Sequence, residues 1–157
     1  MDLRTADQHM DPTRRGKTKQ GLLSIQDDFD MKITIPFKTP TINHLYWHRG
    51  NIKIMTTEAK KIKAEITKII DEMLLTDKYI PHGALLKVIV LIYEDWNCKN
   101  GEVKRKDISN REKFMTDSIF DSLGIDDKFI FEHTMKKIQS TEEKAIITIE
   151  EIKYEKV

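Results

Sequence analysis

The sequence predicts an α/β (α+β) domain in which a small mixed β-sheet packs against two α-helices, in the order β-α-β-α-β-β. Two observations support this prediction. Strand-like and helix-like patterns alternate along the chain, and the run from Leu85 to Tyr93 is almost wholly apolar and rich in β-branched residues. With 157 residues, of which 39% are apolar, the chain is long enough for one hydrophobic core.

The first expected strand runs from Lys32 to Phe37, directly after Met31. Residues 1–30 mix charges, glycine and proline with little periodic apolar content, so we expect a flexible N-terminal tail there and a single domain over 31–157. The alternative is a basic arm that contacts a partner through Arg14, Arg15, Lys17 and Lys19. The first helix is expected from Ile62 to Leu74, where apolar residues recur at helical spacing. Thr56 or Thr57 can cap it.

The apolar run at 85–93 predicts a central strand covered on both faces. Residues 110–123 then follow a helical pattern, and Gly124 suits a left-handed C-terminal cap. At the other end of this helix, Ser109-Asn110-Arg111-Glu112 fits a capping box with Ser109 at the N-cap. Ser109 therefore has a sufficient structural explanation.

Two more strands are expected near residues 129–138 and 144–153, and the short link between them, Ser140 to Glu143, favours an antiparallel hairpin. The formal net charge is only +1, so a nucleic-acid surface would require local clusters of charge. No apolar run approaches the ~20 residues of a membrane span, and the N-terminus shows no secretory signal. We expect a cytoplasmic protein without a membrane partner.

The densest basic cluster comprises Lys104, Arg105, Lys106 and Arg111, which surround Asp107. Each cation could contact a backbone phosphate without reading base sequence. An ordinary charged loop would have the same composition. We favour phosphate contact, because acidic residues that could bind a metal follow directly.

These acidic residues flank and enter the second helix: Asp107 precedes it, Asp117 lies within it, and Asp126 and Asp127 follow it. Carboxylates that converge repel one another, and a divalent cation is the usual compensation. Taken separately, Asp107 would also suit the positive end of a helix dipole, and the aspartate pair would suit a turn.

Helical spacing places Asn110, Lys113, Asp117 and Asp121 on one face of the second helix. This shared polar face favours the functional interpretation of the acids. Lys113 could neutralise charge on a phosphate in a transition state. It could equally be a solvated lysine paired with Asp117 at i+4.

A second mixed segment, Pro40 to Gly50, combines Asn43, Trp47, His48 and Arg49 in one loop. Aromatic, amide and cationic groups together suit stacking on bases and contacts with phosphates. Trp47 could alternatively be anchored in the core.

Together, Asn43, the motif Asp107-x-Ser109-Asn110-x-x-Lys113, Asp117 and the pair Asp126-Asp127 resemble the RusA family of Holliday-junction resolvases. The resemblance covers about Met31 to Ile152. It implies a RusA-like fold and a small homodimeric endonuclease, often encoded by phages or prophages, that cuts branched DNA at four-way junctions with Mg²⁺ or Mn²⁺.

The resemblance also implies roles for individual residues. The catalytic residues would be Asp107, Lys113, Asp126 and Asp127. The metal ligands would be Asp107, Asp127 and, from the helix, Asp117. From the composition of the two basic segments we expect the DNA contacts at Lys104, Arg105, Lys106, Arg111, Asn43, His48 and Arg49. Ser109 and Asn110 would support the site.

The chain departs from the family motif at Ser109, where many members carry a second aspartate. A hydroxyl is a weaker, neutral ligand, so either Asp117 compensates or the enzyme is impaired, and we favour compensation. The first hypothesis is therefore a metal-dependent, structure-selective endodeoxyribonuclease. The alternatives are a catalytically impaired branched-DNA-binding protein and, third, an RNA-binding or RNA-cleaving module that uses the loop around Trp47.

Overall fold

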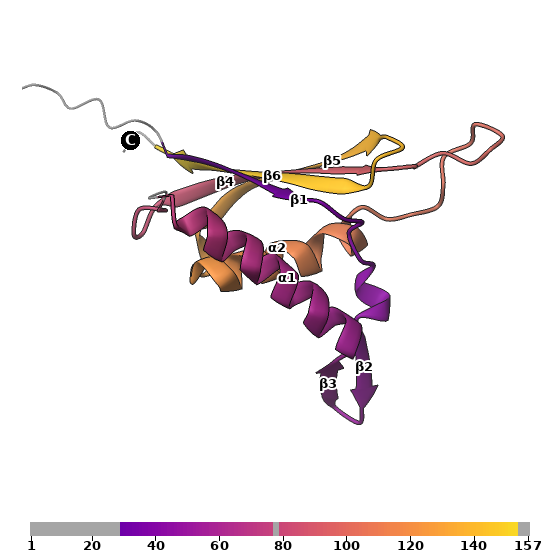
Figure 1. Cartoon of the computed structure of the whole chain (residues 1–157), viewed down its shortest axis with the longest axis horizontal. Helices are drawn as coiled ribbons and strands as arrows, with labels where there is room; N and C mark the ends of the chain where they lie inside the picture. Colours follow the sequence, from indigo (N-terminus) through magenta and orange to yellow (C-terminus); the bar gives the residue numbers. More distant parts are fainter. Residues whose placement is uncertain (1–28, 77–78, 154–157) are drawn as a thin grey trace, which may run out of the picture.

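The computed structural model describes residues 29–76 and 79–153. These residues form a mixed four-stranded sheet with two α-helices on one face, and a two-stranded hairpin that projects away from the sheet (Figure 1). The structure confirms the predicted class and the order of the main elements. It also contains the projecting two-stranded hairpin, which was not predicted. The tail predicted over residues 1–30 falls almost entirely outside the described residues.

The strands of the main sheet are β1 (Asp30–Ile35), β4 (Leu85–Glu94), β5 (Ile130–Gln139) and β6 (Lys144–Ile152). The hairpin consists of β2 (Tyr46–Arg49) and β3 (Ile52–Met55). The helices are α1 (Thr57–Leu74) and α2 (Ser109–Leu123). Short 3-10 turns lie at Ile42–His44 and Asp127–Phe129.

Strand β4 lies inside the sheet, whose order is β1-β6-β4-β5. It pairs antiparallel with β6 and parallel with β5. Because β4 lies between them, β5 and β6 do not pair with each other. The antiparallel hairpin predicted for these two strands is therefore wrong. Their short link instead crosses the end of β4, where the Ser140 N–H donates to the Glu94 carbonyl at 3.0 Å. A link of four residues is long enough to cross one strand, because neighbouring strands lie only about 5 Å apart.

Burial alternates along β4. Leu86, Val88, Val90 and Ile92 are fully buried beneath the helices, whereas the residues between them are half-buried. Within residues 29–76 and 79–153, helices cover only one face of β4, because α1 and α2 lie on the same face (Figure 1), which differs from the cover expected on both faces. The core joins this row to buried residues of the other elements, namely Met31, Ile33, Ile35, Ile66, Ile70, Met115, Ile119, Ala145, Ile147 and Ile149.

The ends of the helices follow the sequence only in part. Thr56 caps α1 by accepting the Ala59 N–H at 3.1 Å, and Gly124 ends α2 with φ 68°, as predicted. The capping box is wrong, because Ile108 occupies the N-cap of α2 without a side-chain cap. None of the described helices is both long and apolar enough to cross a membrane.

Glu112, the expected end of the capping box, is buried and faces β5 instead. Its Oε1 lies 3.2 Å from His133 Nε2. Burial by itself would raise the pKa of Glu112, but hydrogen bonds from His133 and Thr116 outweigh it and lower that pKa. The same contact raises the pKa of His133. This pair holds the first turn of α2 against strand β5.

Candidate active site

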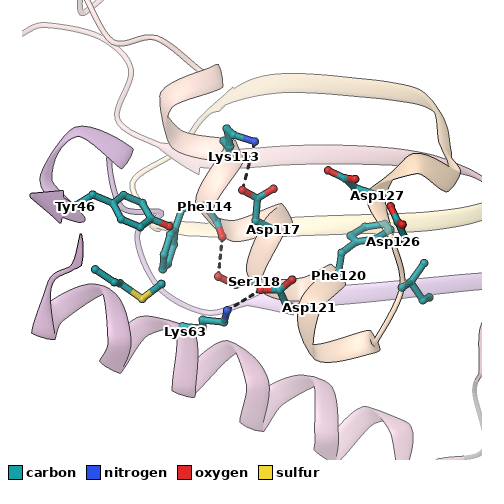
Figure 2. Close-up of a pocket in the computed structure, with 12 residues that line it drawn as sticks. Tyr46, Lys63, Lys113, Phe114, Asp117, Ser118, Phe120, Asp121, Asp126 and Asp127 are labelled. Atoms are coloured by element: carbon teal, nitrogen blue, oxygen red, sulfur yellow. Dashed lines mark hydrogen bonds and ion pairs between the residues drawn. The ribbon is translucent and has the colours of Figure 1, made fainter. Parts of the chain in front are cut away.

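A polar pocket of about 490 Å³ opens between α2, the turn that follows it, α1 and the base of the β2–β3 hairpin (Figure 2). Its charged lining consists of four carboxylates and two lysines: Asp117, Asp121, Asp126, Asp127, Lys63 and Lys113. Tyr46 and Met55 contribute the hairpin side of the wall. The pocket therefore gathers acids and bases from segments that are far apart in the sequence.

Helix α2 supplies the central groups of the pocket. Lys113, Asp117 and Asp121 line the pocket from successive turns, as their spacing predicts, while Met115 and Ile119 are buried in the core. Lys113 Nζ lies 3.4 Å from Asp117 Oδ2, with 62% of the lysine side chain exposed. Exposed pairs of this kind stabilise a protein by less than about 1 kcal/mol, so Lys113 can exchange Asp117 for a phosphate at little cost.

The hydroxyl of Tyr46 and the amino group of Lys63 reach the same pocket and were not predicted. Burial raises the pKa of Tyr46, and the neighbouring Asp117 raises it further, so the hydroxyl stays protonated at neutral pH. Lys63 donates to Asp121 Oδ2 at 2.6 Å across the gap between the two helices. Neither residue has a local sequence signal, because each reaches the pocket only through tertiary packing.

The aspartate pair enters the pocket through the turn after α2. The left-handed Gly124 reverses the chain, and the Asp126 side chain then accepts the Lys128 N–H at 3.0 Å. This backbone hydrogen bond, followed by the contact with the Lys128 ammonium, lowers the pKa of Asp126. Asp126 is therefore ionised and fixed by the turn, and it places the exposed Asp127 beside it.

Asp107 does not line this pocket. Its Oδ1 accepts two hydrogen bonds, from the Ser109 hydroxyl at 2.8 Å and from the Ser109 N–H at 3.0 Å. The hydroxyl and then the backbone N–H lower the pKa of Asp107. In the described part of the chain, no group of three or more His, Cys, Asp or Glu residues is arranged to hold a metal ion. The expected convergence of Asp107 with Asp117 and Asp127 is therefore not formed within it.

The basic cluster at 104–111 is largely neutralised by carboxylates at the end of β4. Lys104 Nζ lies 2.8 Å from Asp95 Oδ2, and Lys106 Nζ lies 2.6 Å from Glu94 Oε1. The hydrogen bond from Lys104, followed by that from Gln139, lowers the pKa of Asp95 to about 2. This differs from the free cationic cluster that we expected for phosphate binding.

Arg111 is buried, with 9% of the residue exposed, so its expected place on the DNA-binding surface is wrong. Its guanidinium donates to the Thr39 carbonyl at 2.9 Å and lies 3.5 Å from Glu94 Oε1. Arg111 thus ties the start of α2 to the segment after β1. Arg105 is the one member of the cluster that is exposed without an ion pair to a described residue.

The segment expected as a loop at 40–50 contains strand β2 and the first turn residue of the β2–β3 hairpin. Gly50-Asn51 forms its turn, with φ 60° at Gly50, and this dipeptide between two short strands is a hairpin signal. Asn43 and Trp47 are exposed, so the alternative of a core-anchored Trp47 is wrong. His48, Arg49 and the unpredicted Lys53 are exposed and form no ion pair with a described residue.

Asn110 is half-buried at the start of α2.

An acidic pocket with two lysines, next to an exposed basic hairpin, is typical of proteins that act on polyanions with the help of a hard cation. The family model for endodeoxyribonuclease RusA matches residues 36–150, well over half of the 157 residues. The chain belongs to the RusA endodeoxyribonuclease family, which confirms the resemblance seen in the sequence. Members of this family are endonucleases that act on Holliday junctions. A comparison with curated proteins finds no match.

Proposed function

We propose that this protein is a metal-dependent, structure-selective endodeoxyribonuclease that resolves four-way DNA junctions by phosphodiester hydrolysis. The observation that carries the proposal is the pocket in which α2 and the following turn gather Lys113, Asp117, Asp126 and Asp127. Cations and carboxylates in one solvent-open pocket suit the binding of a phosphate together with a metal ion. The family membership supports DNA as the source of that phosphate.

The donor chemistry of the pocket fits Mg²⁺ or Mn²⁺. Both ions prefer oxygen ligands, and Mg²⁺ commonly takes one or two carboxylates and completes its shell with water and substrate phosphate. We assign Asp117 and Asp127 as ligands, with Asp126 beside them. Asp107 lies outside this pocket and remains a proposed ligand on the family resemblance, and Ser109 bonds only its Oδ1. When bound, the ion would activate a water molecule and offset charge on the phosphate.

The side chains of the pocket have distinct proposed tasks. Lys113 donates to a non-bridging oxygen of the scissile phosphate after leaving its weak pair with Asp117. The protonated Tyr46 hydroxyl is a neutral donor at the opposite wall. Asp126 holds the turn that presents Asp127. These groups orient the phosphate and its charge before any bond is broken.

The proposed partner is branched DNA, and the proposed assembly is a homodimer. Two copies related by a two-fold axis would present two equivalent pockets, which suits the symmetry of a four-way junction. Arg49, His48 and Lys53 on the hairpin are the proposed phosphate contacts nearest the pocket, and Arg105 is a further one.

Cleavage of labelled four-way junctions and of linear duplex, with Mg²⁺, with Mn²⁺ and with chelator, tests the proposal. We expect symmetric nicks in the junction alone, only with metal, and their loss in Asp127→Asn. Asp71→Asn is a matched control, because Asp71 is an exposed carboxylate on α1 that does not line this pocket. Cutting in chelator, or equal cutting by the Asp127→Asn variant, would contradict the proposal.

One observation favours a second candidate function, a branched-DNA-binding protein with impaired catalysis. The motif position at Ser109 carries a neutral hydroxyl, and no group of three acids, histidines or cysteines in residues 29–76 and 79–153 is arranged to hold a metal. In that case, junction gel shifts persist in chelator, and neither metal produces cuts.

A further inference from the structure

The β2–β3 hairpin presents two faces of different chemistry. Strand register pairs Tyr46 with Met55 and His48 with Lys53, so these four side chains share one face. Tyr46 and Met55 line the polar pocket, and Lys53 Nζ lies 4.0 Å from the centre of the Tyr46 ring. This face therefore extends the wall of the pocket outward with the Lys53 ammonium and the His48 ring.

The opposite face consists of Trp47, Arg49, Ile52 and Ile54. Trp47 is 48% exposed and Ile52 is 64% exposed. The hairpin projects beyond the first turn of α1, away from the sheet, so this face does not pack against the domain core (Figure 1). An indole ring held on a paired strand and open to solvent is a rigid platform for a flat apolar group.

The charge of the hairpin favours a nucleic acid over a second copy of the chain as the partner of this face. Residues 46–55 contain three potential cations, His48, Arg49 and Lys53, and no acid. A second copy of the chain, packed on this face about a two-fold axis, would bring the two Arg49 side chains toward each other. A nucleotide offers a flat base together with a backbone phosphate, which these cations attract.

We propose that the hairpin enters the branch point of the DNA and that Trp47 stacks on a nucleobase exposed there. This inference rests on the proposed action on branched DNA, and it adds a residue that would distinguish branched from linear DNA. The pocket-side face, with His48 and Lys53, follows the strand that leads to the phosphate to be cut. The Trp47 face covers a base that has lost its stacking neighbour. Linear duplex exposes no such base away from its ends.

Binding in chelator tests the inference without cleavage. Junction and duplex affinities are measured for the wild type, Trp47→Ala, Trp47→Phe and Leu75→Ala, with 2-aminopurine at the branch point of the junction. Leu75 is also an exposed apolar side chain, but it lies at the far end of α1, roughly 27 Å of helix away. Trp96 is buried and donates to the Ile92 carbonyl, so a change in tryptophan emission reports on Trp47.

We expect Trp47→Ala to weaken junction binding roughly 5- to 150-fold while duplex affinity changes less than about threefold. Trp47→Phe retains most of the affinity and Leu75→Ala has no effect on it. The wild type and Leu75→Ala quench 2-aminopurine strongly, whereas Trp47→Ala does not. An unchanged junction affinity, or an equal loss on junction and duplex, overturns the inference. So does a change from dimer to monomer in Trp47→Ala by sedimentation, because the face would then contact protein. A wild type without junction preference overturns the proposed function as well.

Discussion

Replacing Arg111 with methionine separates a structural role from a DNA-contact role. Methionine keeps an apolar stem of similar length and removes the guanidinium. In the structure, that guanidinium donates to the Thr39 carbonyl at 2.9 Å and lies 3.5 Å from Glu94 Oε1, with 9% of Arg111 exposed. We therefore expect Arg111→Met to lower the free energy of unfolding and to leave the salt dependence of DNA binding unchanged.

The magnitude follows from the contacts that are lost and kept. Removing one partner of a buried ion pair costs roughly 3–5 kcal/mol, because the other charge stays buried. Glu94 keeps Lys106 at 2.6 Å, which reduces this cost. The lost donor to Thr39 adds about 1 kcal/mol. We expect a net loss of roughly 2–4 kcal/mol, a large part of the 5–15 kcal/mol typical of a whole domain.

Urea unfolding and salt-dependent junction binding give the two readouts, and Arg105→Met is the matched control. Arg105 is exposed without an ion pair to a described residue, so its replacement changes stability by less than about 0.5 kcal/mol and lowers the log–log salt slope by about 1. If Arg111→Met is as stable as the wild type and shifts the salt slope as Arg105→Met does, the buried role assigned to Arg111 is refuted.

The other predictions concern the pocket, the hairpin and pH. Lys113→Ala lowers the single-turnover cleavage rate by about 10²- to 10³-fold and changes junction affinity little, as checked by rapid quench and by gel shift. Asp117→Asn raises the Mg²⁺ concentration for half-maximal cleavage by about tenfold or more, and an unchanged metal titration would remove Asp117 from the site. Lys53→Ala lowers the salt slope of junction binding by about 1, as measured between 50 and 200 mM salt (roughly the range over which phosphate contacts weaken). The pKa of His133 is raised by Glu112, so their pair stabilises fully below the unfolded value of about 6.5 and loses this effect as pH rises through the folded value. The unfolding free energies of wild type and His133→Gln therefore converge as pH is raised from about 5 toward 9.

The fold was predictable where one segment carries its own signal. The β-branched run at 85–93 marks the inner strand β4, and Gly124 marks the end of α2. The separation of β5 and β6 by β4 was not predictable from their short link, because the link is the same whether or not another strand lies between them. Strand β4 occupies that place because it has the longest apolar row to bury against α1 and α2.

The site was predictable along α2 and in the aspartate pair of the following turn, but not in the elements that pack against them. Helical spacing is local, so it placed Lys113 and Asp117 together correctly. The basic cluster was expected to be free for phosphate binding, but Glu94 and Asp95 at the end of β4 form ion pairs with two of its lysines. A count of charges along a segment cannot show which cations are already paired. Among the residues predicted to contact DNA, the cations Arg105 and Arg49 form no ion pair with a described residue, and these are the better candidates for phosphate contact.

Ser109 bears most directly on whether the site is catalytic. An aspartate there would add a second carboxylate close to Asp107 and repel it unless a cation were bound. The serine instead donates twice to Asp107 Oδ1, which fixes the carboxylate and lowers its pKa. Asp107 is thus ionised and held without a metal, although one negative charge is absent. Four carboxylates line the pocket without Asp107 or Ser109, so the proposed ligands Asp117 and Asp127 do not depend on an aspartate at position 109.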